Sequence, residues 1–265
     1  MKSFETFLKL HQQDRVLLLS NAWDAASARV FEEQGATAIA TTSAGVAWSQ
    51  GYADGGKMTA TVNAAVAASI MRVIKVPLTV DFENGYSNDP AVVAENSKLL
   101  LDIGVAGINI EDGRDSPDLL SRKIEAIKRV EQRHGSNLFI NARTDVYLAK
   151  LVSPDDTVKE TIRRGNQYAA AGGDGLFVPF VLNPQEISLI VQAVSLPLNV
   201  LSVPGLPNAN ELADLGVKRL SSGSGIATII WQKAAALAGL FLSGGYEQVL
   251  KEEVMPGSKL NGLFG

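Results

Sequence analysis

Two acidic side chains, Asp81 and Glu83, follow a short apolar run in the stretch V-D-F-E-N-G-Y, residues 80–86. The run 76–80 predicts a buried strand, and the polar residues after it predict a loop. Because side chains alternate along a strand, we expect both acids on the same face of its end. Two carboxylates this close repel each other unless a cation or another donor lies between them. The spacing therefore indicates a cation site.

A third acid, Glu111, ends another apolar run of the chain. Acids from neighbouring strand ends would form an all-oxygen site of the kind that Mg²⁺ or Mn²⁺ prefers, often through water molecules. The alternative is that these acids cap helices or form ion pairs with Arg143 and Arg114. Three acids on neighbouring strand ends favour the metal interpretation.

Arg143, in the segment N-A-R-T-D, ends a further apolar run. A guanidinium there could hold a substrate carboxylate through two parallel hydrogen bonds. The alternative is a structural ion pair with Glu111 or Asp145. The turn 42–45 offers small residues and backbone N–H groups to an anion, whereas 223–225 is expected to be a plain turn.

Other catalytic chemistries find less support. The chain has no cysteine, so a cysteine nucleophile, a cysteine acid and a thiolate metal site are excluded. His11 lies in a predicted N-terminal helix and His134 ends a charged one, so we expect both to be solvated surface residues. No lysine ends a predicted strand, which argues against Schiff-base chemistry.

A repeated pattern indicates how these residues are positioned: a helical stretch, a glycine and then an apolar run. The glycines are Gly35, Gly104, Gly172 and Gly216, each at a predicted helix C-terminus before a strand. The predicted strands are 16–20, 37–42, 78–83, 107–111, 138–143, 175–180, 198–202 and 218–222. Eight alternating βα units favour a (β/α)8 barrel, whose active site lies at the carboxyl ends of the strands. A doubly wound open sheet is the main rival, but the first predicted strand is followed by no glycine-rich dinucleotide loop.

The 265 residues show no composition shift, so we expect one barrel domain over 1–265. The net charge of −4 and the lack of a basic stripe argue against nucleic acid as a partner. We find no signal peptide and no apolar run approaching the roughly 18 residues of a membrane helix, which favours a cytoplasmic protein without a membrane partner. The apolar region 226–250 is expected to be helical and to cover the barrel or pack against another subunit.

Five segments resemble, in order and spacing, the isocitrate lyase/phosphoenolpyruvate mutase superfamily. They are SNAWDAASARVFEEQGATAIATTSAGVA, GYADGG, VDFENGY, GVAGINIEDG and INARTD, and the resemblance covers roughly residues 15–225. It implies a Mg²⁺-dependent barrel that acts on small 2-oxo acids through an enolpyruvate-like intermediate, and Mn²⁺ is the other expected ion. It also suggests a homo-oligomer, a dimer or a tetramer, that exchanges or docks its C-terminal helices.

The resemblance implies roles for individual residues. The metal-site acids would be Asp54, Asp81, Glu83 and Glu111. The substrate-binding residues would be Ser43, Ala44, Gly45, Asp81 and Arg143, and the catalytic residues Asp54 and Arg143. Glu83 stands where the superfamily usually has aspartate, so the longer side chain could shift the metal or hold it through a different water.

The departures from the superfamily decide the expected reaction. Lyase members carry a cysteine-containing gating loop after the fourth strand, whereas here a short segment, 112–118, leads into a helix. The mutase and hydrolase members use lysine and asparagine on that loop, and their barrel histidine would fall near Pro179. We therefore expect carbon–carbon cleavage such as oxaloacetate-type decarboxylation, with Arg114 holding a distal carboxylate. The alternatives are phosphonopyruvate-type P–C chemistry and a non-catalytic 2-oxo-acid-binding protein.

Overall fold

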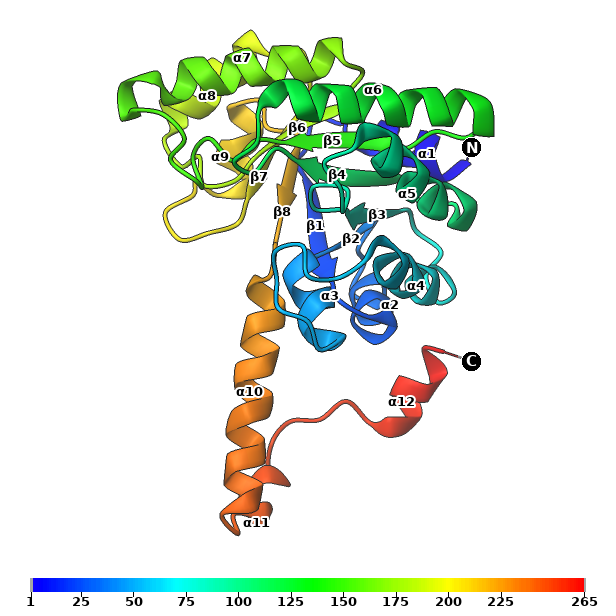
Figure 1. Cartoon of the computed structure of the whole chain (residues 1–265). Helices are drawn as coiled ribbons and strands as arrows, with labels where there is room; N and C mark the ends of the chain where they lie inside the picture. The colour runs from blue at the N-terminus through cyan, green and yellow to red at the C-terminus, as the bar shows by residue number, and fades with distance from the viewer. Residues whose placement is uncertain (1, 265) are drawn as a thin grey trace.

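The computed structural model describes residues 2–264 and contains a closed barrel of eight parallel strands in sequence order (Figure 1). The strands are β1 Leu17–Ala22, β2 Ile39–Thr41, β3 Leu78–Asp81, β4 Gly107–Glu111, β5 Phe139–Arg143, β6 Gly175–Val178, β7 Leu198–Leu201 and β8 Arg219–Ser221. Pairing of β1 with β8 closes the sheet. The predicted (β/α)8 barrel is confirmed, and the doubly wound alternative is wrong because that fold has an open sheet.

Helices connect the strands and cover the outside of the barrel, apart from the last helices of the chain, where α10 projects away from it (Figure 1). They are α1 Lys2–Leu10, α2 Ala25–Glu33, α3 Ser43–Ser49, α4 Ala60–Met71, α5 Pro90–Ile103, α6 Pro117–His134, the 3₁₀ helix η1 Pro154–Asp156, α7 Thr157–Ala170, α8 Pro184–Ala193, α9 Ala209–Asp214, α10 Gly225–Leu242, α11 Tyr246–Val249 and α12 Gly257–Gly262. Each predicted strand range overlaps an observed strand, so the βα alternation is confirmed.

The main hydrophobic core lies between the outer face of the barrel and its helices. Leu78 and Ile108 on strands pack in one cluster with Leu100 of α5 and Ile124 of α6, all fully buried. Burial of one such side chain contributes about 1.5–3 kcal/mol. Strands that are covered on both faces are apolar almost throughout, which is why the sequence shows short continuous apolar runs.

The four glycines before strands end their helices in the left-handed region. Gly35, Gly104, Gly172 and Gly216 have φ between +82° and +102°. At the end of α5, the Gly104 N–H donates to the Leu100 carbonyl, with an N···O distance of 3.2 Å. A residue with a Cβ would be strained at this φ, so the repeated glycine of the sequence pattern follows from helix termination.

Helix α1 packs against the barrel interior through Phe7 and His11. The rings of Phe7 and Phe139 meet edge to face at 5.4 Å, and His11 stacks on Phe139 at 4.2 Å. His11 is 4% exposed, and its Nδ1 lies 2.9 Å from the Phe7 carbonyl oxygen. The expectation of a solvated His11 is wrong: the residue directly follows α1, and the packing of this amphipathic helix on the barrel places His11 against Phe139. His134 is exposed, as predicted, and lies 2.9 Å from Asp102.

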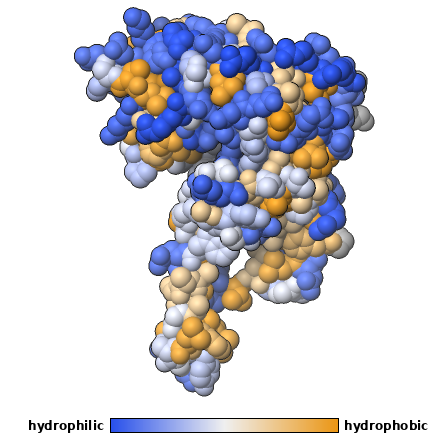
Figure 2. Space-filling model, viewed as in Figure 1, coloured by the Kyte–Doolittle hydropathy of each residue, from blue (hydrophilic) through white to orange (hydrophobic). Residues whose placement is uncertain are grey.

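Helix α10 projects away from the barrel, with α11 at its tip (Figure 1). Within residues 2–264 it is the one helix long and apolar enough, by length and composition, to cross a membrane. The expectation that no apolar run approaches the length of a membrane helix is therefore wrong. Only Gln232 and Lys233 interrupt the apolar sequence of α10. Only 6% of α10 is buried in the structure. Figure 2 shows hydrophobic surface along this projecting arm.

Strand β1 has an outward face that is only partly covered. Leu18 is 56% exposed, although it is the second residue of barrel strand β1. A cavity of about 360 Å³ lies beside it, lined in part by Val16, Phe31 and Ala36. Helix α10 follows β8, next to β1 in the barrel, but it extends outward instead of covering this face.

Candidate active site

A cavity of about 140 Å³ opens at the carboxyl ends of the strands. Its polar lining residues are Asn21, Thr42, Ser43, Asp54, Asp81, Asn109, Arg143, Ser221 and Ser224, and Gly223 also lines it. Its apolar lining residues are Ala44, Leu148, Phe177, Pro179, Phe180 and Leu201. Strand-end residues that are distant in sequence meet here because all eight parallel strands point the same way.

Asp81 is held at the end of β3 by three neighbouring elements. Its Oδ2 accepts a hydrogen bond from the Ser43 N–H at 3.0 Å. Its own N–H donates to the Thr41 hydroxyl at 2.7 Å, and its carbonyl accepts from the Asn63 amide at 2.9 Å. The segment 42–45, predicted as a turn, is instead the start of α3, and the Ser43 contact uses one backbone N–H that we expected to bind an anion.

Glu83 reaches the site through a tight turn and not through strand alternation. Strand β3 ends at Asp81, and Glu83 has a left-handed backbone with φ +49°. Tyr86 is also left-handed, with φ +62°. The expectation that both acids lie on one strand face is therefore wrong. Such conformations cost about 1–3 kcal/mol each and persist only where the surroundings hold them.

The turn after β3 is held by side chains from two helices. The buried Lys123 of α6 donates from Nζ to the Asn84 carbonyl at 2.8 Å. Asn63 of α4 contacts the Tyr86 hydroxyl at 2.6 Å. The Glu83 carboxylate accepts a hydrogen bond from the Gly56 N–H, which connects the segment that contains Asp54 to this turn. Burial and the charges of Asp81 and Asp54 raise the pKa of Glu83.

Glu111 and Arg143 lie opposite each other on β4 and β5. Arg143 Nη1 is 2.8 Å from Glu111 Oε2. Arg143 also donates from Nε and Nη2 to the two carboxylate oxygens of Asp145, at 2.7 and 3.0 Å. Burial raises the pKa of Glu111 to about 8; Arg143 opposes this rise, while the charge of Asp81 adds to it. The sequence left open that Arg143 forms a structural ion pair with Glu111 or Asp145, and the structure contains both of these ion pairs.

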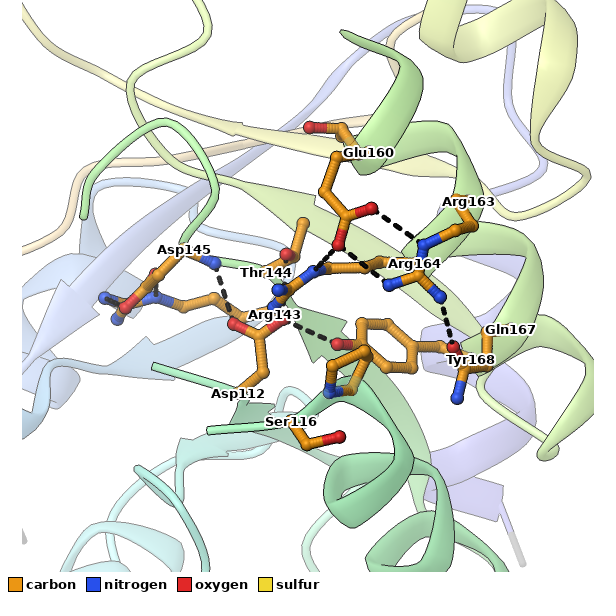
Figure 3. Close-up of polar contacts among 12 residues, drawn as sticks. Asp112, Ser116, Arg143, Thr144, Asp145, Glu160, Arg163, Arg164, Gln167 and Tyr168 are labelled. Carbon is orange, nitrogen blue, oxygen red and sulfur yellow. Dashed lines mark hydrogen bonds and ion pairs between the residues drawn. The ribbon is translucent and has the colours of Figure 1, made fainter. Parts of the chain in front are cut away.

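Asp112 organises the segment that carries Arg143 and Asp145 (Figure 3). It is 2% exposed and accepts hydrogen bonds from the Thr144 hydroxyl at 2.8 Å and the Asp145 N–H at 2.9 Å. Arg164 Nη1 lies 2.7 Å from its Oδ2, and the Tyr168 hydroxyl donates to the same oxygen. Sequence reasoning missed this cluster, although the four-residue spacing of Arg164 and Tyr168 places them on one face of α7.

The floor of the cavity rests on a buried arginine that sequence reasoning also missed. Arg219 of β8 is 1% exposed and donates to the Asn109 side chain at 3.1 Å and to the Ser221 hydroxyl at 3.2 Å. Burial lowers the pKa of Arg219 to about 9, which Asp81 partly offsets. The alternation of Arg219 and Ser221 along one strand face was the available signal.

The predicted site residues fall into two groups. Ser43, Ala44, Asp54, Asp81 and Arg143 line the cavity, whereas Glu83, Glu111 and Gly45 lie outside its lining. At Gly45 an added Cβ would meet Thr42 Cγ2 at 2.7 Å, so close packing requires the glycine. Arg114 is exposed and is not brought to the cavity. Across residues 2–264, no three histidine or acidic side chains are grouped so that they could hold a metal directly.

Comparisons with known proteins identify the family of the chain. The phosphoenolpyruvate phosphomutase family model matches residues 7–242. The uncharacterised protein Rv1998c of Mycobacterium tuberculosis (strain ATCC 25618 / H37Rv) is 40% identical over 223 residues, covering 83% of this chain and 82% of that protein. An oxaloacetate decarboxylase of Pseudomonas entomophila (strain L48) is 32% identical over 170 residues, which cover 59% of this chain and 56% of that enzyme.

Solved structures extend the likeness. A candidate phosphonomutase from Burkholderia cenocepacia J2315 has a TM-score of 0.85 and 37% identity, covering 90% of this chain and 100% of that one. The structure of a 2,3-dimethylmalate lyase, described as a member of the PEP mutase/isocitrate lyase superfamily, shares the fold at a TM-score of 0.85 and 23% identity, with 99% and 94% of the two chains covered. The chain therefore belongs to the phosphoenolpyruvate phosphomutase family, within the isocitrate lyase/phosphoenolpyruvate mutase superfamily.

Proposed function

We propose that the protein is a Mg²⁺-dependent lyase, or one using Mn²⁺, that decarboxylates an oxaloacetate-type 2-oxo acid through an enolpyruvate-like intermediate. One observation carries the proposal: Asp54 and Asp81 line a cavity that also contains the Arg143 guanidinium. The resemblance to an oxaloacetate decarboxylase, at 32% identity, supports the same reaction class.

The chemistry of the acids fits a hydrated cation. Burial is the main cause that raises the pKa values of Glu83 and Glu111, and the charge of Asp81 adds to both shifts. An excess of close carboxylates is the donor set that a hard divalent cation prefers, and water molecules can complete its coordination. Asp54 and Asp81 line the cavity, so they would hold the ion, with Glu83 and Glu111 behind them. When bound, the cation would polarise the 2-oxo group of the substrate.

The side chains of the chain would orient the substrate. A guanidinium has five N–H donors, and Arg143 uses three of them on Asp145 and Glu111, so two remain for a substrate carboxylate. The two acids fix the plane of the guanidinium before a ligand arrives. Fixed donors lose less conformational entropy on binding than a free side chain does.

The loop after β4 supports decarboxylation over reactions that need a protein acid. Only residues 112–116 separate Glu111 from the first residue of α6. The chain contains no cysteine that could protonate a departing enolate. Decarboxylation makes the least demand here, since water can protonate the enolate once CO2 has left.

Product analysis tests the proposed function. We expect Mg²⁺-dependent release of CO2 and pyruvate from oxaloacetate above a no-enzyme control, and none of that excess with EDTA. Isocitrate and 2-methylisocitrate should yield no glyoxylate. Phosphate release from phosphonopyruvate would favour P–C chemistry instead. Binding of 2-oxo acids without turnover of any of these compounds would favour a non-catalytic binding protein.

We also propose that a second copy of this chain packs against α10 and the open face of β1. Ile229, Ile230 and Trp231 on α10 are 68%, 48% and 44% exposed. The same chain leaves Leu18 exposed on β1. A reciprocal contact would bury both surfaces at once, as two-fold symmetric dimers do. Exposed apolar surfaces of this kind mark interaction sites.

A further inference from the structure

The cavity has two chemically different sides. Asp54 and Asp81 come from the β2–β4 side of the barrel. Five apolar residues come from the adjacent β5–β7 side: Leu148, Phe177, Pro179, Phe180 and Leu201. Because the strands follow in order around the barrel, each set forms a continuous stretch of the wall. We call the second set the apolar wall.

Arg143 lies at the boundary between the two sides. Its guanidinium carbon is 5.8 Å from the centroid of the Phe177 ring. Phe177 lies on β6, next to β5, and belongs to the apolar wall. Among the lining residues that the structure describes, Arg143 is the one cationic side chain. Its Nε, Nη1 and Nη2 contact Asp145 and Glu111, and the proposed function assigns its two remaining N–H donors to the substrate carboxylate. No Arg143 donor is then left for a ligand group that extends toward β6 and β7.

The outer part of the apolar wall is exposed to solvent. Leu148 is 41% exposed and Phe180 is 43% exposed. Phe180 has a left-handed backbone with φ +66°, a conformation that is costly for an aromatic residue. Phe180 thus presents a large apolar side chain at the cavity, where the hydrophobic effect would favour a ligand that covers it.

We propose that the apolar wall is the subsite for an alkyl substituent on the 2-oxo acid, so that the substrate carries an apolar group at C3. The inference rests on the proposed function, which places the carboxylate and the 2-oxo group beside the acids and Arg143. A substituent at C3 other than the departing carboxylate would then lie against Phe177 and Leu201. A charged group there would lose its water without gaining a partner, which is costly, whereas methylene groups would lose only unfavourable hydration.

A matched set of three ligands tests this assignment by calorimetry, with Mg²⁺ present. Pyruvate has no tail, 2-oxopentanoate has an alkyl tail, and 2-oxoglutarate has the same length with a carboxylate at its end. We expect 2-oxopentanoate to bind about fifteenfold more tightly than pyruvate, since each buried methylene contributes about fourfold. We expect the affinity for 2-oxoglutarate to be at least about tenfold lower than that for 2-oxopentanoate, because the second carboxylate of 2-oxoglutarate would be desolvated.

Two exposed leucines provide variants with a matched control. Leu148→Arg adds a cation at the apolar wall and should reverse the preference in favour of 2-oxoglutarate. Leu189→Arg changes a leucine on α8 that is 52% exposed and outside the cavity lining, and it should leave the preference unchanged. Leu201→Ala should reduce the advantage of 2-oxopentanoate while pyruvate binding is retained.

The outcomes separate this inference from the proposed function. If pyruvate binds and 2-oxoglutarate binds as tightly as 2-oxopentanoate, the alkyl subsite is overturned while 2-oxo-acid binding stands. An unchanged preference in Leu148→Arg also overturns the subsite. If none of the three ligands binds, both the subsite and the proposed function are overturned.

Discussion

The Glu111 carboxylate and the Arg143 guanidinium face each other across strands β4 and β5, with 2.8 Å between Oε2 and Nη1. The other edge of the same guanidinium is held by both oxygens of Asp145. The carboxylates of Glu111 and Asp145 therefore hold the Arg143 guanidinium in a single orientation at the wall of the cavity. Its remaining donors are preorganised for a ligand, which is why the geometry of Arg143 matters as much as its charge.

Arg143→Lys is expected to weaken binding of pyruvate or oxaloacetate by about 1.5–3 kcal/mol, although the charge is kept. An ammonium group is a compact point charge and cannot reproduce the planar contacts that Arg143 makes. Calorimetry in the presence of Mg²⁺ measures the change. Arg122→Lys, at an exposed position on α6, is the matched control. Unchanged affinity in the Arg143 variant would show that the residue is only an ion-pair partner.

Asp81→Ala is expected to remove Mg²⁺-dependent ligand binding and to leave the fold intact. The charge of Asp81 raises the pKa values of Glu83 and Glu111, so its removal relieves repulsion in the metal-free protein. The melting temperature in EDTA should therefore stay the same or rise. Asp155→Ala, at an exposed position in η1, controls for the loss of one surface charge. Retained Mg²⁺-dependent binding would contradict the metal assignment.

Asp112→Asn is expected to lower the free energy of unfolding by about 1.5–3 kcal/mol, because Arg164 loses one of its two carboxylate partners and keeps only Glu160, at 2.7 Å. Urea unfolding measures this loss. Asp118→Asn removes an exposed carboxylate that contacts Gln167 at 2.6 Å and should change stability by about 0.5 kcal/mol or less. A small effect at Asp112 would mean that the cluster of Figure 3 does not stabilise this side of the barrel.

His11 is expected to make the protein sensitive to acid. Burial lowers the pKa of His11 to about 3, and the charge of Arg219 acts in the same direction. Below the ordinary histidine pKa of about 6.5, the unfolded chain binds a proton that the folded protein does not. Stability from this group is therefore complete above pH 6.5 and falls by about 1.4 kcal/mol per unit as the pH decreases toward 3.

The variant His11→Phe should remove this contribution to the pH dependence. We expect the slope of the free energy of unfolding between pH 6 and pH 4 to become smaller than in the parent protein. His134→Phe changes the exposed histidine and should leave the slope nearly the same. Parallel pH profiles for the parent and the His11 variant would rule out the buried neutral histidine.

Leu18→Lys is expected to weaken self-association, since it places a charge on the open face of β1. Light scattering after gel filtration measures the molar mass over a range of concentrations. Leu189→Lys changes a leucine of similar exposure on α8 and should leave the mass unchanged. A parent protein that is monomeric, or one that sediments with lipid vesicles through α10, would contradict the proposed contact between copies.

Local sequence signals were sufficient for the barrel and for several positions of the site. The glycines before four of the strands reflect helix termination, which is a local property of the chain. The short apolar runs are typical of parallel strands that helices cover on the outside. Asp81 and Arg143 were recognisable because each directly ends a strand, and a parallel barrel brings all strand ends to one rim.

Tertiary structure alone decided the contacts that join distant segments. Asp112 meets Arg164 and Tyr168 across more than 50 residues of sequence. Arg219 contacts Asn109 over a separation of 110 residues, and His11 is buried because α1 packs against Phe139. A sequence specifies which residues can be buried, but the partner of a buried charge depends on how the closed barrel brings separate strands and helices together. For the same reason Arg114, although close in sequence to the acids, lies outside the cavity.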